Sequence, residues 1–169
     1  MIVIMAVSAM MIAPSYFSAT RASLDDEAKR LVQVLRLAQE EAALSGRNYR
    51  IRFRQHSYSF QSIARGGKWQ TLHGSPYGRR ALKDGIHIVA IRPEPPLSDS
   101  SRDSSTNSDA SNNPDQEKEP LLAELLIPVE GIHQVADIVL AAPADGGETE
   151  RIVAFHPGPG GIQIKQAAP

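Results

Sequence analysis

The hydrophobic repeat of the sequence changes once, near Gly46, and this change limits the folds open to the chain. Before Gly46, apolar residues recur at alternating spacings of four and three, which places them on one face of a helix. After it, Tyr49, Ile51 and Phe53 alternate with arginines, as in a half-buried strand. The helical face comprises Leu24, Ala28, Leu31, Leu35, Ala38 and Ala42. The sequence therefore predicts an α+β fold in which one long helix precedes a group of strands.

Acidic and glycine residues predict where this helix begins and ends. We expect it to begin at Ser23, because the acidic residues 25–27 would then lie in the first turn, where the helix dipole favours negative charge. Gly46 should end it. Strands are predicted at 49–54, 58–63, 68–72, 86–91, 121–129, 135–143, 151–155 and 161–165. The strands before residue 93 should form an antiparallel meander, and the last two a hairpin, so that the helix packs on one small sheet.

The first thirteen residues form an apolar run in which only Ser8 is polar. At about 1.5 Å per residue, such a run covers about two-thirds of the roughly 30 Å of a bilayer core. We interpret it as the C-terminal part of a longer apolar helix that ends near Pro14 and continues into the amphipathic helix, so that the long N-terminal helix is first apolar and then amphipathic. The residues expected to make membrane and assembly contacts are Ile2, Val3, Ile4, Val7, Ile12 and Pro14. The predicted organisation is an apolar segment at 1–22 and a globular domain at 23–169.

A polar segment interrupts the strand pattern at 93–120. It contains seven serines and seven acidic residues, and Leu97 is its only large apolar residue. A segment of this composition cannot bury enough apolar surface to offset the entropy of ordering it. We therefore expect a disordered insertion in a loop of the domain.

Positive charge is concentrated in one part of the chain. Residues 47–92 contain ten Lys or Arg residues and one acidic residue, a net charge of +9, although the whole chain has a net charge of −1. Within this part, Arg50, Arg52 and Arg54 share one face of the predicted strand at 49–54. A solvated outer face is the favoured interpretation, and a docking surface for an acidic partner or for nucleic acid phosphate is the alternative. On the helix, Val34 and Leu37 lie off the main apolar stripe and are candidates for contact with a neighbouring subunit.

The sequence offers no support for an enzyme or a cofactor site. It contains no cysteine, which excludes disulfides, thiol nucleophiles and cysteine-based zinc sites. Its five histidines are scattered, without the spacing of a helical metal motif. The glycine-rich "GPGG" precedes a predicted strand instead of the helix that a phosphate-binding loop requires. Trp69, Tyr58 and Phe60 are expected in the core between helix and sheet.

Several segments, taken in order, resemble one family. These are Pro14 after the apolar run, "LVQVLRLAQEEAALSGRNYRIRF" leading from the helix to the first strand, "YSF" with the isolated Trp69, "LKDGIHI" before the polar segment, "LLIPVEG" after it, and the closing "RIVAFHPGPGGIQIK". The chain resembles H-type minor pseudopilins of type II secretion systems, which are related to FimT-like minor pilins. The resemblance covers nearly all of the chain outside 93–120, and it implies a pilin-like α+β fold.

The resemblance also implies a function. Such proteins are non-enzymatic subunits of a short pseudopilus that assists protein export across the outer membrane. Their apolar helix anchors them in the bacterial inner membrane as single-pass proteins, with the globular domain in the periplasm, and later packs among the helices of other major and minor pseudopilins. No cofactor is implied. A DNA-binding minor pilin involved in DNA uptake is the alternative, although DNA is the less favoured partner, because Tyr49, Ile51 and Phe53 should point away from the arginines.

The sequence departs from the family at its start. Family precursors carry a basic leader and then Gly-Phe-Thr-Leu-x-Glu, where a peptidase cuts and methylates the new N-terminal amine. Neither is present before the apolar run. We therefore expect the coding sequence upstream of Met1 to encode both.

Overall fold

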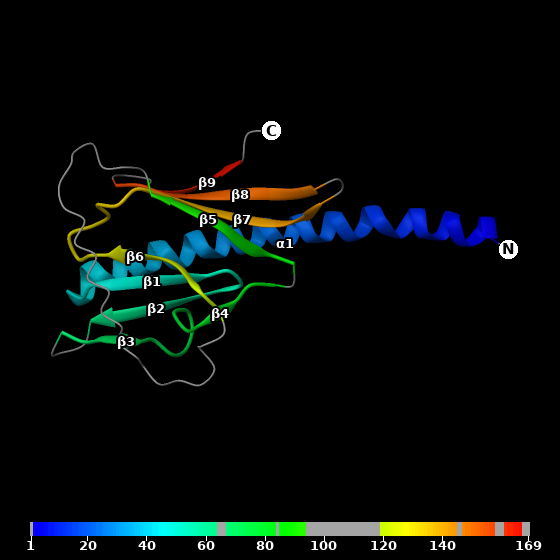
Figure 1. The fold of residues 1–169 in the computed structure, drawn as a ribbon. Coiled ribbons are helices and arrows are strands. Elements are labelled where there is room, and N and C mark those ends of the chain that lie inside the picture. The colour runs from blue at the N-terminus through cyan, green and yellow to red at the C-terminus, as the bar shows by residue number, and fades with distance from the viewer. Residues whose placement is uncertain are drawn as a thin grey trace.

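The computed structural model describes residues 2–63, 67–83, 85–93, 119–144, 147–157 and 161–166, with residues 2–19 as helical backbone only. The single helix of this part of the chain, α1 (Ile2–Ser45), runs along two antiparallel sheets, and its N-terminal half extends beyond them (Figure 1). The strands are β1 (Tyr49–Arg54), β2 (Ser57–Ile63), β3 (Trp69–Thr71), β4 (Arg80–Ala81), β5 (His87–Pro93), β6 (Leu121–Ile127), β7 (Ala136–Ala144), β8 (Gly147–Phe155) and β9 (Ile162–Gln166).

The helix begins well before the predicted start at Ser23. It is continuous through Pro14, although a proline there removes one backbone hydrogen bond. Asp25 and Glu27 are in the helix interior, and their carboxylates bind arginines from the sheets: Arg151 Nε donates to Asp25 Oδ1 at 2.5 Å, and Arg80 pairs with Glu27. The prediction of a helix start at Ser23 was wrong because these acidic residues bind distant strands instead of capping a helix.

The helix ends where the sequence predicts. Gly46 has a φ of 64° and donates its N–H to the carbonyl of Ala42 at 3.0 Å. This left-handed conformation satisfies a carbonyl of the last turn and turns the chain toward β1. An L-residue with a side chain rarely adopts that conformation, which explains the glycine.

The first sheet contains the strands expected near the helix, together with one from much later in the chain. Its order is β3-β2-β1-β6, and β4 pairs with β2. Strand β1 has the predicted bounds, and its burial alternates as expected. Strand β1 is antiparallel to both of its neighbours. Ile51 lies opposite Phe60 of β2 and opposite Leu125 of β6.

The strands form two sheets, so the prediction of one small sheet was wrong. The order of the second sheet is β5-β7-β8-β9, so β5 does not continue the meander of β1, β2 and β3. Strand β5 pairs with β7 instead, and the register shifts between Ile88 and Ala90. The closing hairpin is confirmed, because β8 and β9 are antiparallel, with Phe155 opposite Ile162. Most of the predicted insertion at 93–120, namely 94–118, lies outside the described residues.

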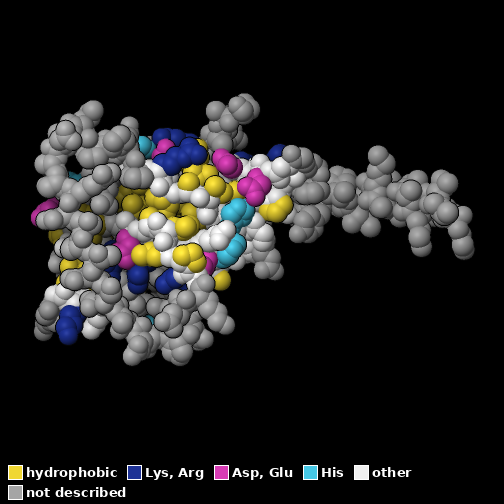
Figure 2. Space-filling view, viewed as in Figure 1, with side chains coloured by type: hydrophobic (Ala, Val, Ile, Leu, Met, Phe, Trp, Pro, Cys, Tyr) yellow, Lys and Arg dark blue, Asp and Glu magenta, His cyan; other side chains and the backbone are white. Residues whose placement is uncertain are grey.

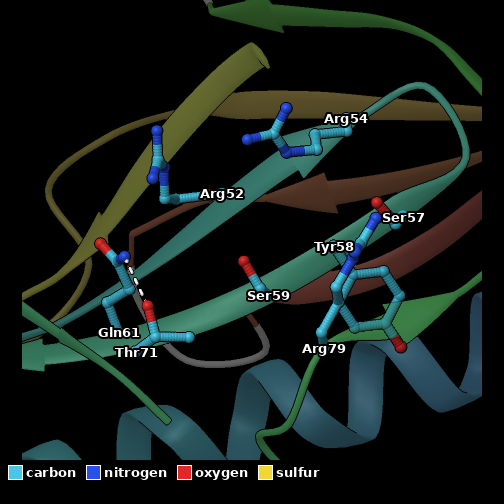
Figure 3. Close-up of a pocket in the computed structure, with 8 residues that line it drawn as sticks. All are labelled: Arg52, Arg54, Ser57, Tyr58, Ser59, Gln61, Thr71 and Arg79. Atoms are coloured by element: carbon cyan, nitrogen blue, oxygen red, sulfur yellow. Dashed lines mark hydrogen bonds between the residues drawn. The ribbon is translucent and has the colours of Figure 1, made fainter. Parts of the chain in front are cut away.

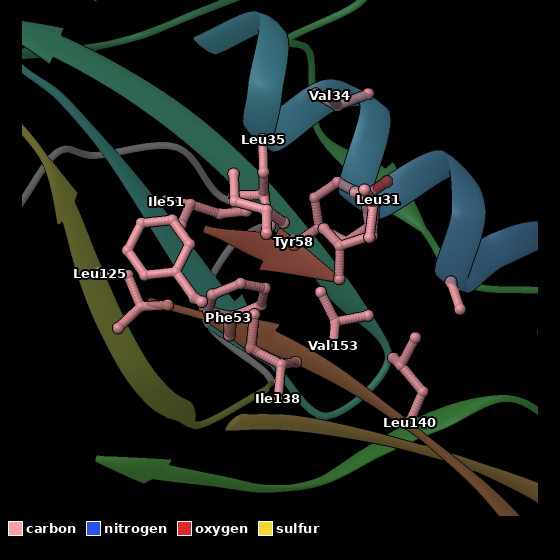
Figure 4. Packing of buried hydrophobic residues seen from close by; sticks show 14 of the residues in the cluster. Leu31, Val34, Leu35, Ile51, Phe53, Tyr58, Leu125, Ile138, Leu140 and Val153 are labelled. Carbon is pink, nitrogen blue, oxygen red and sulfur yellow. The ribbon is translucent and has the colours of Figure 1, made fainter. Parts of the chain in front are cut away.

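The core lies between α1 and the inner faces of both sheets (Figure 4). The predicted helical stripe is fully buried; for example, Leu31, Leu35 and Ala38 have almost no exposed surface. The helix packs on β7, β8 and β9 of the second sheet and also contacts β1 and β6 of the first. The core side chains of the first sheet include Ile51, Phe53, Tyr58, Phe60 and Leu125, and those of the second include Ile138, Leu140, Val153 and Phe155. The alternate residues of β1 face away from this core and are half-buried.

Candidate functional site

The three arginines of β1 lie together on the outer face of the first sheet. Each of these side chains is half-buried, whereas Tyr49, Ile51 and Phe53 are buried in the core, as the alternation predicts. The register places Arg50 opposite Gln61 and Arg52 opposite Ser59 of β2. We use the term arginine face for this outer surface of β1, β2, β3 and β6.

Arg50 is held by contacts on three sides. Its Nε donates to Gln61 Oε1 at 2.6 Å, and its Nη1 donates to Glu124 Oε2 of β6 at 3.0 Å. The guanidinium carbon also lies 4.4 Å from the centroid of the Trp69 ring, a cation–π contact. Arg50 is therefore fixed by its own domain.

Glu124 also neutralises the second arginine. Its Oε1 lies 2.8 Å from Arg52 Nε, an ion pair that lacks hydrogen-bond geometry. One carboxylate of β6 thus bridges two arginines of β1. Arg50 and Arg52 are therefore partly solvated and also paired within the domain, because β6 brings an acid opposite them. The sequence analysis does not single out Glu124, although it is the only charged residue of "LLAELLI".

Arg54 has a different environment at the end of β1. Among the described residues, no acidic group lies within 4 Å of its guanidinium as an ion pair. Burial lowers the pKa of Arg54, and repulsion by Arg52 and Arg79 lowers it further, while Glu119 acts in the opposite direction. This end of the arginine face therefore holds positive charges close together.

A shallow hollow lies between these arginines (Figure 3). Its floor is formed by β2 and its sides by β1, β3 and the chain before β4. The residues that line it include Arg52, Arg54, Ser57, Ser59, Thr71 and Arg79. Gln61 also lines the hollow and donates its side-chain Nε2–H to Thr71 Oγ1 at 3.0 Å. Such a lining of cations and hydroxyls suits an oxyanion.

Trp69 lies on the arginine face and not in the core between helix and sheet, where we expected it. Residue 69 is opposite Ile63 and residue 71 is opposite Gln61, so the side chain of Trp69 shares a face with Arg50. The expectation was wrong because β3 is a short edge strand with a half-buried side chain at this position. Tyr58 and Phe60 are buried in the core, as predicted.

A charge pair between a buried glutamate and a partly exposed arginine connects the helix with the first sheet. The Glu27 side chain is 2% exposed, and Arg80 Nη2 of β4 lies 3.3 Å from its Oε2. Arg80 Nε also approaches Glu27 Oε1 at 3.4 Å, so the contact uses both oxygens. The sequence offers no signal that distinguishes this glutamate from its solvent-facing neighbours. Its role is to fix β4 against α1.

The two partner candidates on the helix have different surroundings. Val34 is 6% exposed and belongs to the core, so its side chain does not form part of the accessible surface. Leu37, one turn further along the helix, is 42% exposed. The burial of Val34 argues against contact with a neighbouring subunit. A core between two sheets needs a wider apolar helix face than a core on one sheet. Leu37 remains a candidate.

The apolar candidates near the N-terminus lie in the first half of α1. Residues Ile2, Val3, Ile4, Val7, Ile12 and Pro14 all have helical backbone, and their side chains are outside the described part of the structure. Within that described part, no helix has both the length and the apolar character that crossing a bilayer requires.

The histidines do not form a metal centre among the described residues, where no group of three or more potential ligands lies close together. The rings of His56 and His87 contact each other in a tilted arrangement with centroids 6.2 Å apart, which joins the β1–β2 turn to the start of β5. His156 lies near Asp137 and Lys165 on the second sheet. These contacts connect neighbouring strands.

Comparisons with known proteins identify a shared fold. No family model matches the chain, and no curated protein does. Two solved structures of the minor pseudopilin EpsH from the type II secretion system of Vibrio cholerae are similar. One has a TM-score of 0.55 and 16% identity, and the alignment covers 85% of this chain and 97% of that one. For the other, the values are 0.51, 18%, 88% and 95%. The chain therefore has the predicted pilin-like α+β fold, the fold of a minor pseudopilin.

Proposed function

We propose that the chain is a non-enzymatic structural subunit of a type II secretion pseudopilus. The observation that carries this proposal is the extent of the structural likeness, which spans 97% and 95% of the two EpsH chains. A likeness of this extent covers the arrangement of the helix and both sheets, whereas a shared supersecondary motif would cover only a few elements. EpsH is a minor pseudopilin of a type II secretion system, and the proposal assigns this chain the same kind of role.

The two halves of α1 would then serve different purposes. The apolar residues at 1–13 would anchor the protein in the bacterial inner membrane and later pack among the helices of other pseudopilins, while the domain faces the periplasm. Leu37 would extend these contacts, because it lies on α1 with 42% of its side chain exposed. Partners of this kind need apolar helices of their own.

A complementation experiment tests the proposal. Deleting the gene should abolish export of the proteins that the secretion system carries, and the full chain should restore it. Because the chain has no cysteine, Leu37→Cys introduces a single thiol for cross-linking to neighbouring subunits. Val34→Cys is the matched control, since its side chain is buried. Normal export in the deletion strain would contradict the proposal, and so would equal cross-linking of the two variants.

DNA uptake is the second candidate function, and one observation favours it. Trp69 lies on the arginine face, so an aromatic side chain accompanies the cations there, contrary to our expectation. However, Arg50 covers that ring, and Glu124 neutralises two of the arginines. On the face shown in Figure 2, the visible Lys and Arg side chains form separate groups with hydrophobic side chains between them. DNA is therefore the less favoured partner, and duplex binding at about 150 mM salt should be negligible.

A further inference from the structure

The hollow on the arginine face contains guanidinium and hydroxyl groups, both of which can bind a carboxylate. Arg52 and Arg54 come from β1, and Arg79 comes from the chain just before β4 on the other side of β2 (Figure 3). Ser59 lies on β2 between these groups, and Thr71 closes one end. The hollow thus presents guanidinium groups from two directions and hydroxyl groups between them.

The arginines at this site are close enough to repel one another. Positive charge on Arg52 and Arg79 contributes to lowering the pKa of Arg54, after burial. Like charges that are partly buried together destabilise the fold, and a bound anion would offset this repulsion. Arg52 and Arg54 lie on β1 and Arg79 lies just before β4, so the backbone holds the three side chains near one another.

The chain itself shows how this surface receives a carboxylate. At the rim of the hollow, Glu119 Oε2 accepts a hydrogen bond from Ser57 Oγ at 3.0 Å. Its other oxygen accepts from the backbone N–H of His56, and its charge acts on Arg54. A carboxylate is therefore already bound through a hydroxyl and a backbone donor beside the hollow.

We propose that this hollow binds an aspartate or glutamate side chain of a neighbouring subunit. The identity of the partner rests on the proposed function, whereas the carboxylate chemistry rests on the hollow. Glu124 at one end and Glu119 at the rim favour a single carboxylate over a polyanion, because a phosphate backbone would pass close to both. Guanidinium groups bind carboxylates through two parallel hydrogen bonds, which gives the contact a defined orientation.

The test is a titration of the full chain in neutral detergent with the singly acidic peptide acetyl-Gly-Gly-Glu-Gly-Gly-amide at about 50 mM salt, a concentration at which surface charges are only partly screened. Chemical shifts of the Ser59 and Thr71 amides should change and saturate. The uncharged peptide acetyl-Gly-Gly-Gln-Gly-Gly-amide should leave them unchanged. Arg54→Gln and Arg79→Gln should each weaken binding about tenfold, as expected for the loss of one charged hydrogen-bond partner.

Arg92→Gln is the matched control, because it removes the same charge from an exposed position on β5 of the other sheet. It should alter the affinity by less than about twofold, since it lies away from the hollow. Equal affinity in wild type, Arg54→Gln and Arg79→Gln would overturn the proposal, and so would equal shifts with the uncharged peptide. Tighter binding of a duplex DNA oligomer that is lost in Arg54→Gln would also overturn it, in favour of a phosphate site.

The outcome is distinguishable from that of the secretion experiment. If the peptide does not bind while the full chain restores export, the hollow is excluded and the secretion role stands. If the peptide binds but the gene deletion leaves export unchanged, the carboxylate site stands and its partner belongs to another assembly.

Discussion

The two sheets of this domain use their outer faces in opposite ways. In β7 of the second sheet, Ile138 and Leu140 join the core, and Val139 and Ala141 on the alternate positions are also fully buried. In β1 of the first sheet, the positions between the core residues are arginines, and Glu124 binds two of them, Arg50 and Arg52. Antiparallel sheets commonly have one apolar and one polar face; β1 follows that rule, whereas β7 is buried on both faces at these positions.

We therefore expect the second sheet to contribute mainly to stability and the first sheet mainly to recognition of other molecules. The second sheet receives most of the helix and buries both sides of its central strand, so substitutions there should mainly change the free energy of unfolding. The first sheet displays cations that can bind another molecule, so substitutions there should mainly change affinity. Matched substitutions on the two sheets test this division.

The largest effect is expected for a leucine in the second sheet. Leu140→Ala removes a fully buried side chain from β7 and should lower the free energy of unfolding by about 2–5 kcal/mol. Leu126→Ala is the matched change on β6 of the first sheet, where the side chain is 38% exposed, and it should cost about 1 kcal/mol or less. Urea unfolding followed by circular dichroism measures both. Equal losses would show that the two sheets contribute alike.

The buried glutamate of α1 should have the next largest effect. Glu27→Gln removes the negative charge beside Arg80 and leaves a buried amide, which should cost about 1–3 kcal/mol of unfolding free energy. Glu130→Gln is the control, because the Glu130 side chain is 84% exposed, and its cost should be about 0.5 kcal/mol or less. The same urea titration applies. An unchanged free energy of unfolding in Glu27→Gln would mean that the packing of β4 does not depend on this charge pair.

A smaller effect is expected for the acid that bridges the arginine face. In a double-mutant cycle of Arg52→Gln and Glu124→Gln, the coupling energy should be about 0.2–1 kcal/mol, because both side chains are partly solvated. The single change Glu124→Gln should also strengthen binding of the acidic peptide, since it releases two arginines. If it weakens peptide binding instead, Glu124 orients the site, and charge alone does not explain the affinity.

The smallest effect concerns alkaline pH. Burial raises the pKa of Tyr77 to about 12, with further contributions from Glu41, Tyr49 and Glu40. An unfolded tyrosine ionises near pH 10, so the stability contributed by the neutral phenol is complete below about pH 10 and is lost as the pH rises to about 12. Tyr77→Phe should therefore make the decline of stability between these pH values shallower. Thermal melts at pH 9 to 12 measure this decline, and an unchanged slope would contradict the assignment.

Local patterns in the sequence determined the elements of this fold. The spacing of apolar residues from Leu24 to Ala42 predicts the buried face of α1, and Gly46 predicts its end. The alternation at 49–54 predicts both the strand and the side of it that carries the arginines. These features depend on neighbours within a few residues, and the repeat of a helix or strand encodes them directly.

Only the tertiary structure decided how those elements combine. The period of two does not specify a partner strand, so the sequence could not place β5 beside β7 or β6 beside β1. That pairing brings Glu124 to Arg50 and Arg52, and the edge position of β3 brings Trp69 onto the arginine face. The candidate site arises from contacts between residues that are up to 74 positions apart, such as Arg50 and Glu124, and no local repeat records such distances.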